Sequence, residues 1–403
     1  MSTYGTLSAG NLILSNPNGS FNFLQSLNSV ASISVLCSLF DKSLEISDCA
    51  SDFHTKVTGG AQHVKEVDHV ALNVFGTGDR VVLQSKEYIP SQIGSTRIVT
   101  ITANMEPVSG VVSRVGCFDD AVDNLENRGD GYYFEMNEGA LYACFRTSTS
   151  PSGEVKIQQS LFNIDRLDGS GASLYTFDSS TATTFVISYE SRTGSVKVGI
   201  IARGSIIFVH RFDPSSSYGP IRATSLPVRF EIESAGSEGT LMALNGAVST
   251  SGSIPRGIKR SCGTGARATD VSVNAASHPI VSLKLQSQYR RASARITGVR
   301  ISSTASVFWE LLLNASPAGA AWKPTSSSGV TEYDVSSAAL DAGDSIVIAS
   351  GYVRADDAAL VEINDAPPLT SSILGDSEIY TLNAVALMSS CLVWGGLELV
   401  EIV

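Results

Sequence analysis

Histidine and cysteine are the residue types most able to bind a transition metal, and this chain has five histidines and six cysteines. His54, His63 and His69 are close in sequence, but no two histidines have the H-E-x-x-H spacing that places two ligands on one helix face. No two cysteines form a C-x-x-C pair, which excludes zinc-ribbon and thioredoxin-type sites. We therefore expect no metal site, and reduced, buried thiols.

Residues for covalent or acid–base catalysis lack a recognisable arrangement in this sequence. It has no G-x-S-x-G elbow for a serine nucleophile and no phosphate-binding P-loop. The carboxylate pair of a glycoside hydrolase comes from distant strands and has no local signature, so a β-fold glycan hydrolase stays open as an alternative. We expect no catalytic residue, no cofactor and no enzymatic activity.

An acidic stretch supplies enough oxygen atoms for a calcium ion. It comprises Asp119, Asp120, Asp123, Glu126 and Asp130. Its spacing is not that of the D-x-[DN]-x-[DN]-G loop that wraps calcium. We interpret the stretch as a solvated turn in front of a strand.

Exposed aromatic side chains are the residues on which a sugar ring could stack. Trp309 and Trp394 lie in apolar runs, which predicts that both are buried in a core. Trp322, between Ala321 and Lys323, is the better candidate for exposure. A ligand-binding role is therefore predicted for Trp322, with Tyr132 and Tyr352 as further candidates.

The elements that would position these residues are strands. No segment repeats apolar residues at helical spacing for three turns, whereas short apolar or alternating runs bounded by Gly, Ser, Asn and Asp recur. The clearest runs are 98–103, 132–136, 141–145, 185–189, 196–201, 206–210, 228–232, 280–285, 308–313 and 345–352. The sequence predicts a mainly β fold of two antiparallel β-sandwich, jelly-roll-like domains.

Composition supports a folded chain with few charges. Of 403 residues, 43% are hydrophobic and 17% are charged, and the net charge of −11 argues against nucleic acid as a partner. The first 40 residues carry no charge, but the segment lacks the basic n-region of a signal peptide. We expect no membrane span.

The polar stretch after residue 248 separates the two predicted domains. We predict an N-terminal assembly arm or small subdomain at 1–77, a β-sandwich domain at 78–248, a linker at 249–256 and a C-terminal β-sandwich domain at 257–403.

Charge is polarised within the C-terminal domain. Residues 256–300 hold nine basic side chains against Asp270 alone, and residues 301–403 hold two basic against thirteen acidic side chains. The two runs either neutralise each other on one domain or meet across subunits. For the second case the predicted subunit contacts are Arg256, Lys259, Arg260, Arg290, Arg291 and Arg295.

From Gly78 onward, the order of short motifs resembles a family of fibre-like and shell virion structural proteins of tailed phages and of large DNA viruses of microbial hosts. The matching motifs are Gly78-Asp79-Arg80-Val81, Tyr88-Ile89-Pro90-Ser91-Gln92-Ile93-Gly94, Arg114-Val115-Gly116-Cys117-Phe118-Asp119, Gly129-Asp130-Gly131-Tyr132-Tyr133-Phe134-Glu135, the segment 158–171, Leu226-Pro227-Val228-Arg229-Phe230-Glu231-Ile232, and 309–314 with Trp322, Tyr333-Asp334 and Ser350-Gly351-Tyr352.

The resemblance implies a non-enzymatic virion structural protein, such as a tail or head fibre, a vertex protein or a capsid-associated component. We expect it to self-assemble as a trimer, to contact other virion proteins, and to reach the virion after synthesis in the host cytoplasm. Two alternatives stay open: a carbohydrate-binding module that recognises a host surface glycan as receptor, and the β-fold glycan hydrolase.

Overall fold

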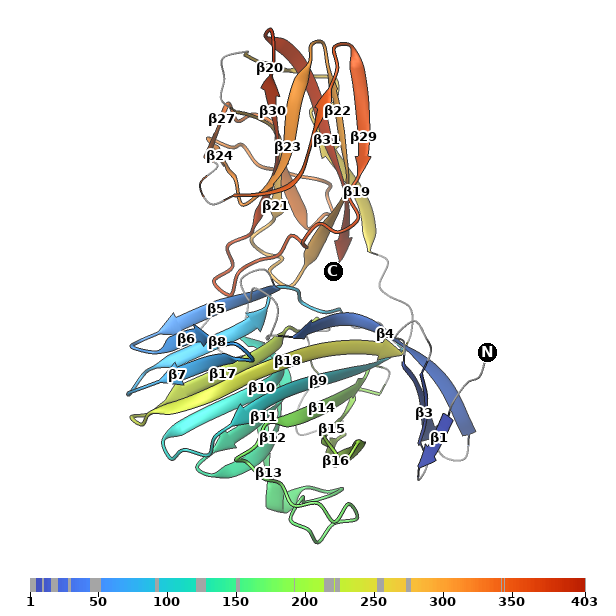
Figure 1. The fold of residues 1–403 in the computed structure, drawn as a ribbon, viewed down its shortest axis with the longest axis vertical. Coiled ribbons are helices and arrows are strands. Elements are labelled where there is room, and N and C mark those ends of the chain that lie inside the picture. The colour runs from blue at the N-terminus through green and yellow to red at the C-terminus, as the bar shows by residue number, and fades with distance from the viewer. Residues whose placement is uncertain are drawn as a thin grey trace. The chain divides into compact units, whose positions relative to one another are not determined.

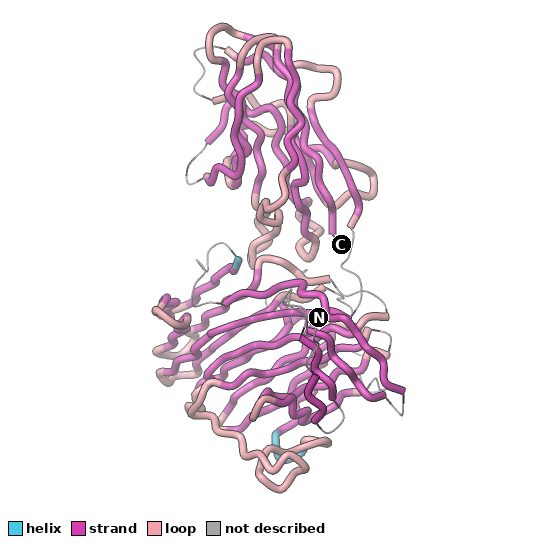
Figure 2. Tube along the Cα trace, turned by 45° about the vertical axis from the view of Figure 1, so that its right-hand side comes forward, coloured by secondary structure: helices cyan, strands magenta, loops and turns pink. Residues whose placement is uncertain are grey.

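The computed structural model describes residues 5–8, 11–15, 21–27, 30–43, 52–90, 94–120, 128–149, 153–191, 193–213, 221, 225–251, 257–272, 277–341, 343 and 345–402. The chain divides into two compact units, Met1–Pro255 (unit 1) and Arg256–Val403 (unit 2). Strands make up most of the described chain in both units (Figure 2). The predicted mainly β, antiparallel sandwich fold is confirmed.

One sheet of unit 1 has seven strands in the order β13-β12-β11-β10-β17-β8-β5 (Figure 1). Their bounds are β5 Phe53–Thr58, β8 Arg80–Ser85, β10 Val111–Asp120, β11 Arg128–Asn137, β12 Ala140–Thr147, β13 Gly153–Gln158 and β17 Val228–Ser234. A short 3-10 helix, η1, spans Gln159–Leu161 after β13. Within the described residues, no helix is long and apolar enough to cross a membrane.

The second sheet of unit 1 has eleven strands, with β18 near its middle. Nine follow the order β1-β2-β3-β4-β18-β9-β14-β15-β16, β7 also pairs with β18, and β6 pairs with β7. Their bounds are β1 Gly5–Ser8, β2 Asn11–Ser15, β3 Phe21–Leu27, β4 Val30–Ser43, β6 Gln62–Lys65, β7 Val70–Val74, β9 Thr96–Met105, β14 Thr183–Glu190, β15 Ser195–Ala202, β16 Ser205–Phe212 and β18 Gly239–Ser251.

The core of unit 1 lies between these two sheets. Burial alternates strictly along strand β9: Val99 and Ile101 are buried, and the residues between them are half-buried. This pattern is expected of a strand with one face covered by the core. Phe134 of the seven-stranded sheet and Phe185 of the eleven-stranded sheet meet with ring centroids 4.8 Å apart. Burial of such side chains is the main stabilising contribution to the sandwich.

The predicted boundary at residue 77 does not coincide with a break in the sheets. Strand β5 pairs with β8, and β7 pairs with β18, so residues 53–74 are integral to the sandwich of unit 1.

Unit 2 is a smaller sandwich with its own core. One sheet has the order β19-β31-β22-β29, with β20 also paired to β31; the other has the order β25-β26-β21-β30-β23-β28; β24 and β27 form a separate pair. The bounds are β19 Ile258–Gly263, β20 Thr269–Val271, β21 His278–Leu285, β22 Ser293–Ser303, β23 Val307–Leu313, β24 Ser316–Ala318, β25 Lys323–Pro324, β26 Thr331–Asp334, β27 Ala339–Asp341, β28 Ile346–Val353, β29 Asp357–Glu362, β30 Ile379–Ala386 and β31 Cys391–Ile402.

Trp309 is buried in the core of unit 2, as its apolar run predicts. Gly351 of the neighbouring β28 lies against it, and a Cβ there would come 3.0 Å from Trp309 Cζ2. The indole therefore takes the space that a side chain at residue 351 would need.

Candidate functional site

A layer of paired charges covers the face of the seven-stranded sheet that points away from the core of unit 1. Arg114 on β10 lies at its centre and forms ion pairs with three glutamates: Nε with Glu135 at 2.7 Å, Nη1 with Glu231 at 2.8 Å and Nη2 with Glu233 at 2.7 Å. The members, which we call the charge layer, are Arg80, Arg114, Arg146, Arg229, Lys156, Asp120, Glu135, Glu154, Glu231 and Glu233. Five positive and five negative side chains give it no net charge.

Two glutamates of the charge layer, Glu231 and Glu135, have a lowered pKa. Burial alone would raise the pKa of Glu231, but Arg229, Arg114 and Arg80 outweigh it and hold that pKa well below its usual range. Burial is likewise outweighed at Glu135 by Arg114 and Lys156, so its pKa is lowered too. The proton donor of a glycosidase needs a raised pKa, so neither glutamate is suited to that role.

The two ends of the acidic stretch, Asp119 and Asp130, are not in a solvated turn, which corrects that interpretation for the described residues. Asp119 and Asp130 are fully buried on β10 and β11. Asp130 accepts hydrogen bonds from the Ser148 amide and hydroxyl at 2.8 and 3.1 Å. The described residues hold no group of three or more His, Cys, Asp or Glu that could bind a metal ion, and Asp123 and Glu126 lie outside them.

A groove of about 670 Å³ lies on the β19-β31-β22-β29 sheet of unit 2. On β31, Val393, Leu397 and Leu399 are buried in the core. The alternating residues Trp394, Gly396 and Glu398 therefore face away from the core. The outward face of β31 therefore presents, in order, the indole of Trp394, the backbone of Gly396 without a side chain, and the carboxylate of Glu398.

Neighbouring strands complete the groove through their register. Ser302 of β22 lies opposite Trp394, and Arg300 lies opposite Gly396. On the far side, Gly263 of β19 also faces Gly396, and a Cβ at Gly263 would come 2.4 Å from the Gly395 carbonyl oxygen. Small residues, Gly263, Gly396 and Ser302, thus line the groove together with Trp394 and Arg300.

The groove offers a ligand one aromatic ring, that of Trp394, and one exposed ion pair, Arg300 with Glu398. The Trp394 Nε1 donates to the Ala266 carbonyl oxygen at 3.5 Å, which fixes the half-buried indole. Arg300 donates to Glu398, and their side chains are 65% and 31% exposed. Leu360, opposite Arg300 on β29, is 62% exposed and adds an apolar wall.

Cys262 also lines the groove, but it is not a nucleophile at neutral pH. Burial raises the pKa of its thiol to about 12, so the thiol stays protonated. Cys117, Cys144 and Cys391 are free thiols as well.

The three aromatic residues predicted to bind a ligand differ in accessibility. Tyr132 is 1% exposed and stacks on Tyr189 inside unit 1, because its side chain points inward from β11. The prediction that Tyr132 binds a ligand is therefore wrong. Trp322 is half-buried, with Lys284 Nζ 4.4 Å from its ring centroid. Tyr352 is 73% exposed beside Phe308, and its binding role stays a prediction, as does that of Trp322.

The polarised charges of unit 2 meet within the chain. Arg260 pairs with Glu401 at 3.1 Å and Lys284 with Glu332 at 3.3 Å, each joining the basic run to the acidic run. This pattern favours neutralisation on one domain.

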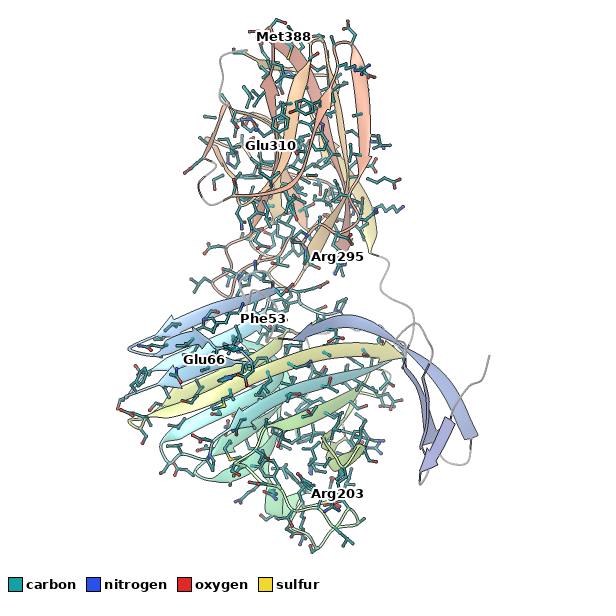
Figure 3. All side chains as sticks on the ribbon, in the orientation of Figure 1. Phe53, Glu66, Arg203, Arg295, Glu310 and Met388 are labelled. Carbon is teal, nitrogen blue, oxygen red and sulfur yellow. The ribbon has the colours of Figure 1, made fainter. Side chains whose placement is uncertain are left out.

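The predicted subunit contacts are placed as follows. Lys259 and Arg295 are exposed, with Arg295 on β22 (Figure 3), and Arg290 and Arg291 are half-buried. Arg256 lies outside the described residues. A subunit role for these residues stays a prediction.

Sequence reasoning missed the groove because it placed Trp394 in the core. The apolar run Cys391-Leu392-Val393-Trp394 suggests full burial, but Leu392 and Trp394 alternate with the buried Cys391 and Val393. The glycine pair at 395 and 396 was the available signal, since two glycines in a strand mark a close approach or an open surface.

No protein-family model matches the chain, and no curated protein matches its sequence. Solved structures do resemble it. One, from work on endo-acting O-glycanases of the human gut microbiota, is 13% identical with a TM-score of 0.38 and covers 53% of this chain and 98% of its own. An endo-1,3-beta-glucanase from Streptomyces sioyaensis (9% identity, TM-score 0.35) covers 53% and 96%, and peanut lectin (8%, 0.32) covers 53% and 97%. At such identities the likeness concerns the fold alone.

These neighbours correct two predictions. The prediction of a non-enzymatic virion structural protein is corrected, because the similar solved structures named above are glycanases and a lectin. The same finding stands against the expectation of no enzymatic activity, since a glucanase, a transglycosylase and a glycosyl hydrolase are among the solved structures that resemble the chain in fold. The motif resemblance and the virion location stay predictions, and nothing in these comparisons supports the trimer.

Proposed function

We propose that the protein binds neutral glycans in the groove of unit 2. The observation that carries the proposal is the position of Trp394 next to the Arg300–Glu398 pair, with glycine and serine lining the same groove. A pyranose ring has an apolar C–H face that packs on an aromatic ring, and hydroxyl groups around its edge. The proposed binding mode stacks one sugar ring on Trp394.

The ion pair supplies complementary hydrogen-bonding groups. A sugar hydroxyl both donates and accepts, so adjacent hydroxyls can donate to Glu398 and accept from Arg300. Since the pair carries no net charge, the groove favours neutral over anionic sugars. Its volume of about 670 Å³ lies within the usual range of ligand sites, roughly 300–1,000 Å³.

The test is affinity electrophoresis of the full chain in gels that contain laminarin, mannan, starch or alginate. We expect retardation by at least one neutral polysaccharide and none by alginate. Trp394→Ala should weaken that binding about tenfold or more, because it removes the stacking surface at the centre of the site.

Trp322→Ala is the matched control, because it removes the other incompletely buried tryptophan of unit 2 and should leave binding unchanged. Loss of binding in Trp322→Ala alone would move the site to Trp322. No retardation by any of the neutral polysaccharides would overturn the proposal. A reducing-sugar assay on the same polysaccharides reports cleavage separately from binding.

A further inference from the structure

One sheet edge of unit 2 lacks the features that normally prevent strand pairing. Strand β28 ends the order β25-β26-β21-β30-β23-β28. Among the described residues, β23 is its only hydrogen-bonded neighbour strand, and no other backbone hydrogen bond reaches residues 346–353. Its outer edge therefore presents unpaired N–H and C=O groups, which are a template for another strand.

The composition of β28 makes this edge unusual within unit 2. Its sequence, Ile-Val-Ile-Ala-Ser-Gly-Tyr-Val, contains no charge and no proline, and Ile346, Val347 and Tyr352 are 57%, 51% and 73% exposed. Such uncharged, β-branched segments are those that pair readily. The exposed apolar side chains add a hydrophobic contribution to any pairing.

The other edge strands of unit 2 are protected. Strand β19 carries Lys259 and Arg260, β25 consists of Lys323 and Pro324, and β29 has Asp357 and Glu362 at its ends. Charges and proline on an edge oppose the addition of a strand, because a new neighbour would bury them or lose a hydrogen bond. The protection is absent from β28 alone among the ends of the two large sheets of this unit.

We propose that β28 pairs antiparallel with β28 of a second copy of this chain and forms a twofold dimer. A strand that docks here must itself be an open, uncharged edge, and β28 meets that requirement. Antiparallel pairing of a strand with its own copy uses the same surface on both partners, so the assembly closes at two chains. Because each chain carries a net charge of −11, an uncharged edge is the contact that adds no close repulsion.

The pairing also accounts for the outward side chains of β28. Val347 and Tyr352 lie on the sheet face away from the core, opposite Leu312 and Phe308 of β23. In an antiparallel pair, Val347 can lie opposite Tyr352 of the second copy, and Tyr352 can lie opposite Val347 of the second copy. Two exposed apolar residues of each chain then become buried.

The test is the solution mass of the full chain by light scattering behind a sizing column, over a range of concentrations in low and high salt. We expect twice the 42.4 kDa of the chain, and the same mass in high salt, because the contact contains no ion pair. Val347→Lys places a charge on the edge and should yield the monomer.

Ile258→Lys is the matched control: Ile258 is 50% exposed on the edge strand β19 and should leave the dimer intact. Tyr352→Lys is the second variant if Val347→Lys does not fold, as judged by circular dichroism. For the wild type, a monomer at every concentration, a trimer, or dissociation in high salt would overturn the proposal. For the variants, it would be overturned by a dimer that persists in folded Val347→Lys and Tyr352→Lys, or by Ile258→Lys dissociating the dimer to the same extent as these two.

Discussion

At the scale of single residues, Arg114 is the side chain on which the charge layer depends. It is 3% exposed and reaches three glutamates, two of which are themselves buried. Removal of the guanidinium leaves the buried carboxylates of Glu135 and Glu231 with fewer partners. A buried charge that loses its partner is costly, whereas an exposed one is not.

Arg114→Met should therefore destabilise unit 1 by about 3–5 kcal/mol, measured as the shift in its urea unfolding transition. Arg166→Met replaces an exposed arginine of the same unit and should change the transition by less than about 0.5 kcal/mol. Equal effects of the two substitutions would show that the charge layer contributes nothing specific.

The lowered pKa of Glu231 predicts a loss of stability in acid. The unfolded side chain takes up a proton near its ordinary pKa of 4.5, whereas the folded one does so only at lower pH. Below about pH 4.5 the unfolded state therefore binds more protons, so stability that is complete above this pH falls as the pH falls further. Urea midpoints of unit 1 between pH 7 and pH 3 would measure the decline.

Glu231→Gln separates this effect from general acid denaturation. The variant should be less stable than wild type at pH 7, because Arg229 and Arg114 lose a charged partner, and its stability should fall less steeply below pH 4.5. Parallel pH profiles of the two proteins would contradict the assignment of acid sensitivity to Glu231.

At the scale of elements, the sequence predicts strands well and their outward faces poorly. The runs 98–103, 185–189 and 228–232 all lie inside observed strands, because alternation and β-branched residues mark a half-buried strand wherever it pairs. Which charged residues on those strands would meet could not be predicted. Arg114 and Glu231 are 117 residues apart and come together only through the register of β10 and β17.

Gly131 shows why the start of β11 was missed. It reads as a turn residue next to Gly129, but it lies within the strand, and a Cβ there would come 2.2 Å from Phe118 Cβ. Close approach of β10 and β11, not a turn, requires the glycine. Sequence alone does not distinguish the two reasons.

At the scale of the whole molecule, the two units have separate cores. Among the described residues, the core cluster of unit 1 contains no residue of unit 2, and the core cluster of unit 2 contains no residue of unit 1. Every strand that lines the groove belongs to unit 2. The structure of the groove therefore needs no strand of unit 1.

Residues 256–403 expressed alone should fold and retain the wild-type affinity for any polysaccharide that the full chain binds. Near-ultraviolet circular dichroism would report the packed Trp309, and affinity electrophoresis would report binding. A fragment that folds but binds more weakly than the full chain would show that unit 1 contributes to the site.

Each unit ends with a strand that lies inside a sheet. Strand β18, the last of unit 1, lies between β9 on one side and β4 and β7 on the other, and β31 lies between β22 on one side and β19 and β20 on the other. During synthesis, neither sheet can close until the ribosome has released that last strand. Until then, the strands that will lie on either side of it have no bridging partner, so synthesis is the stage at which a chaperone would be of most use.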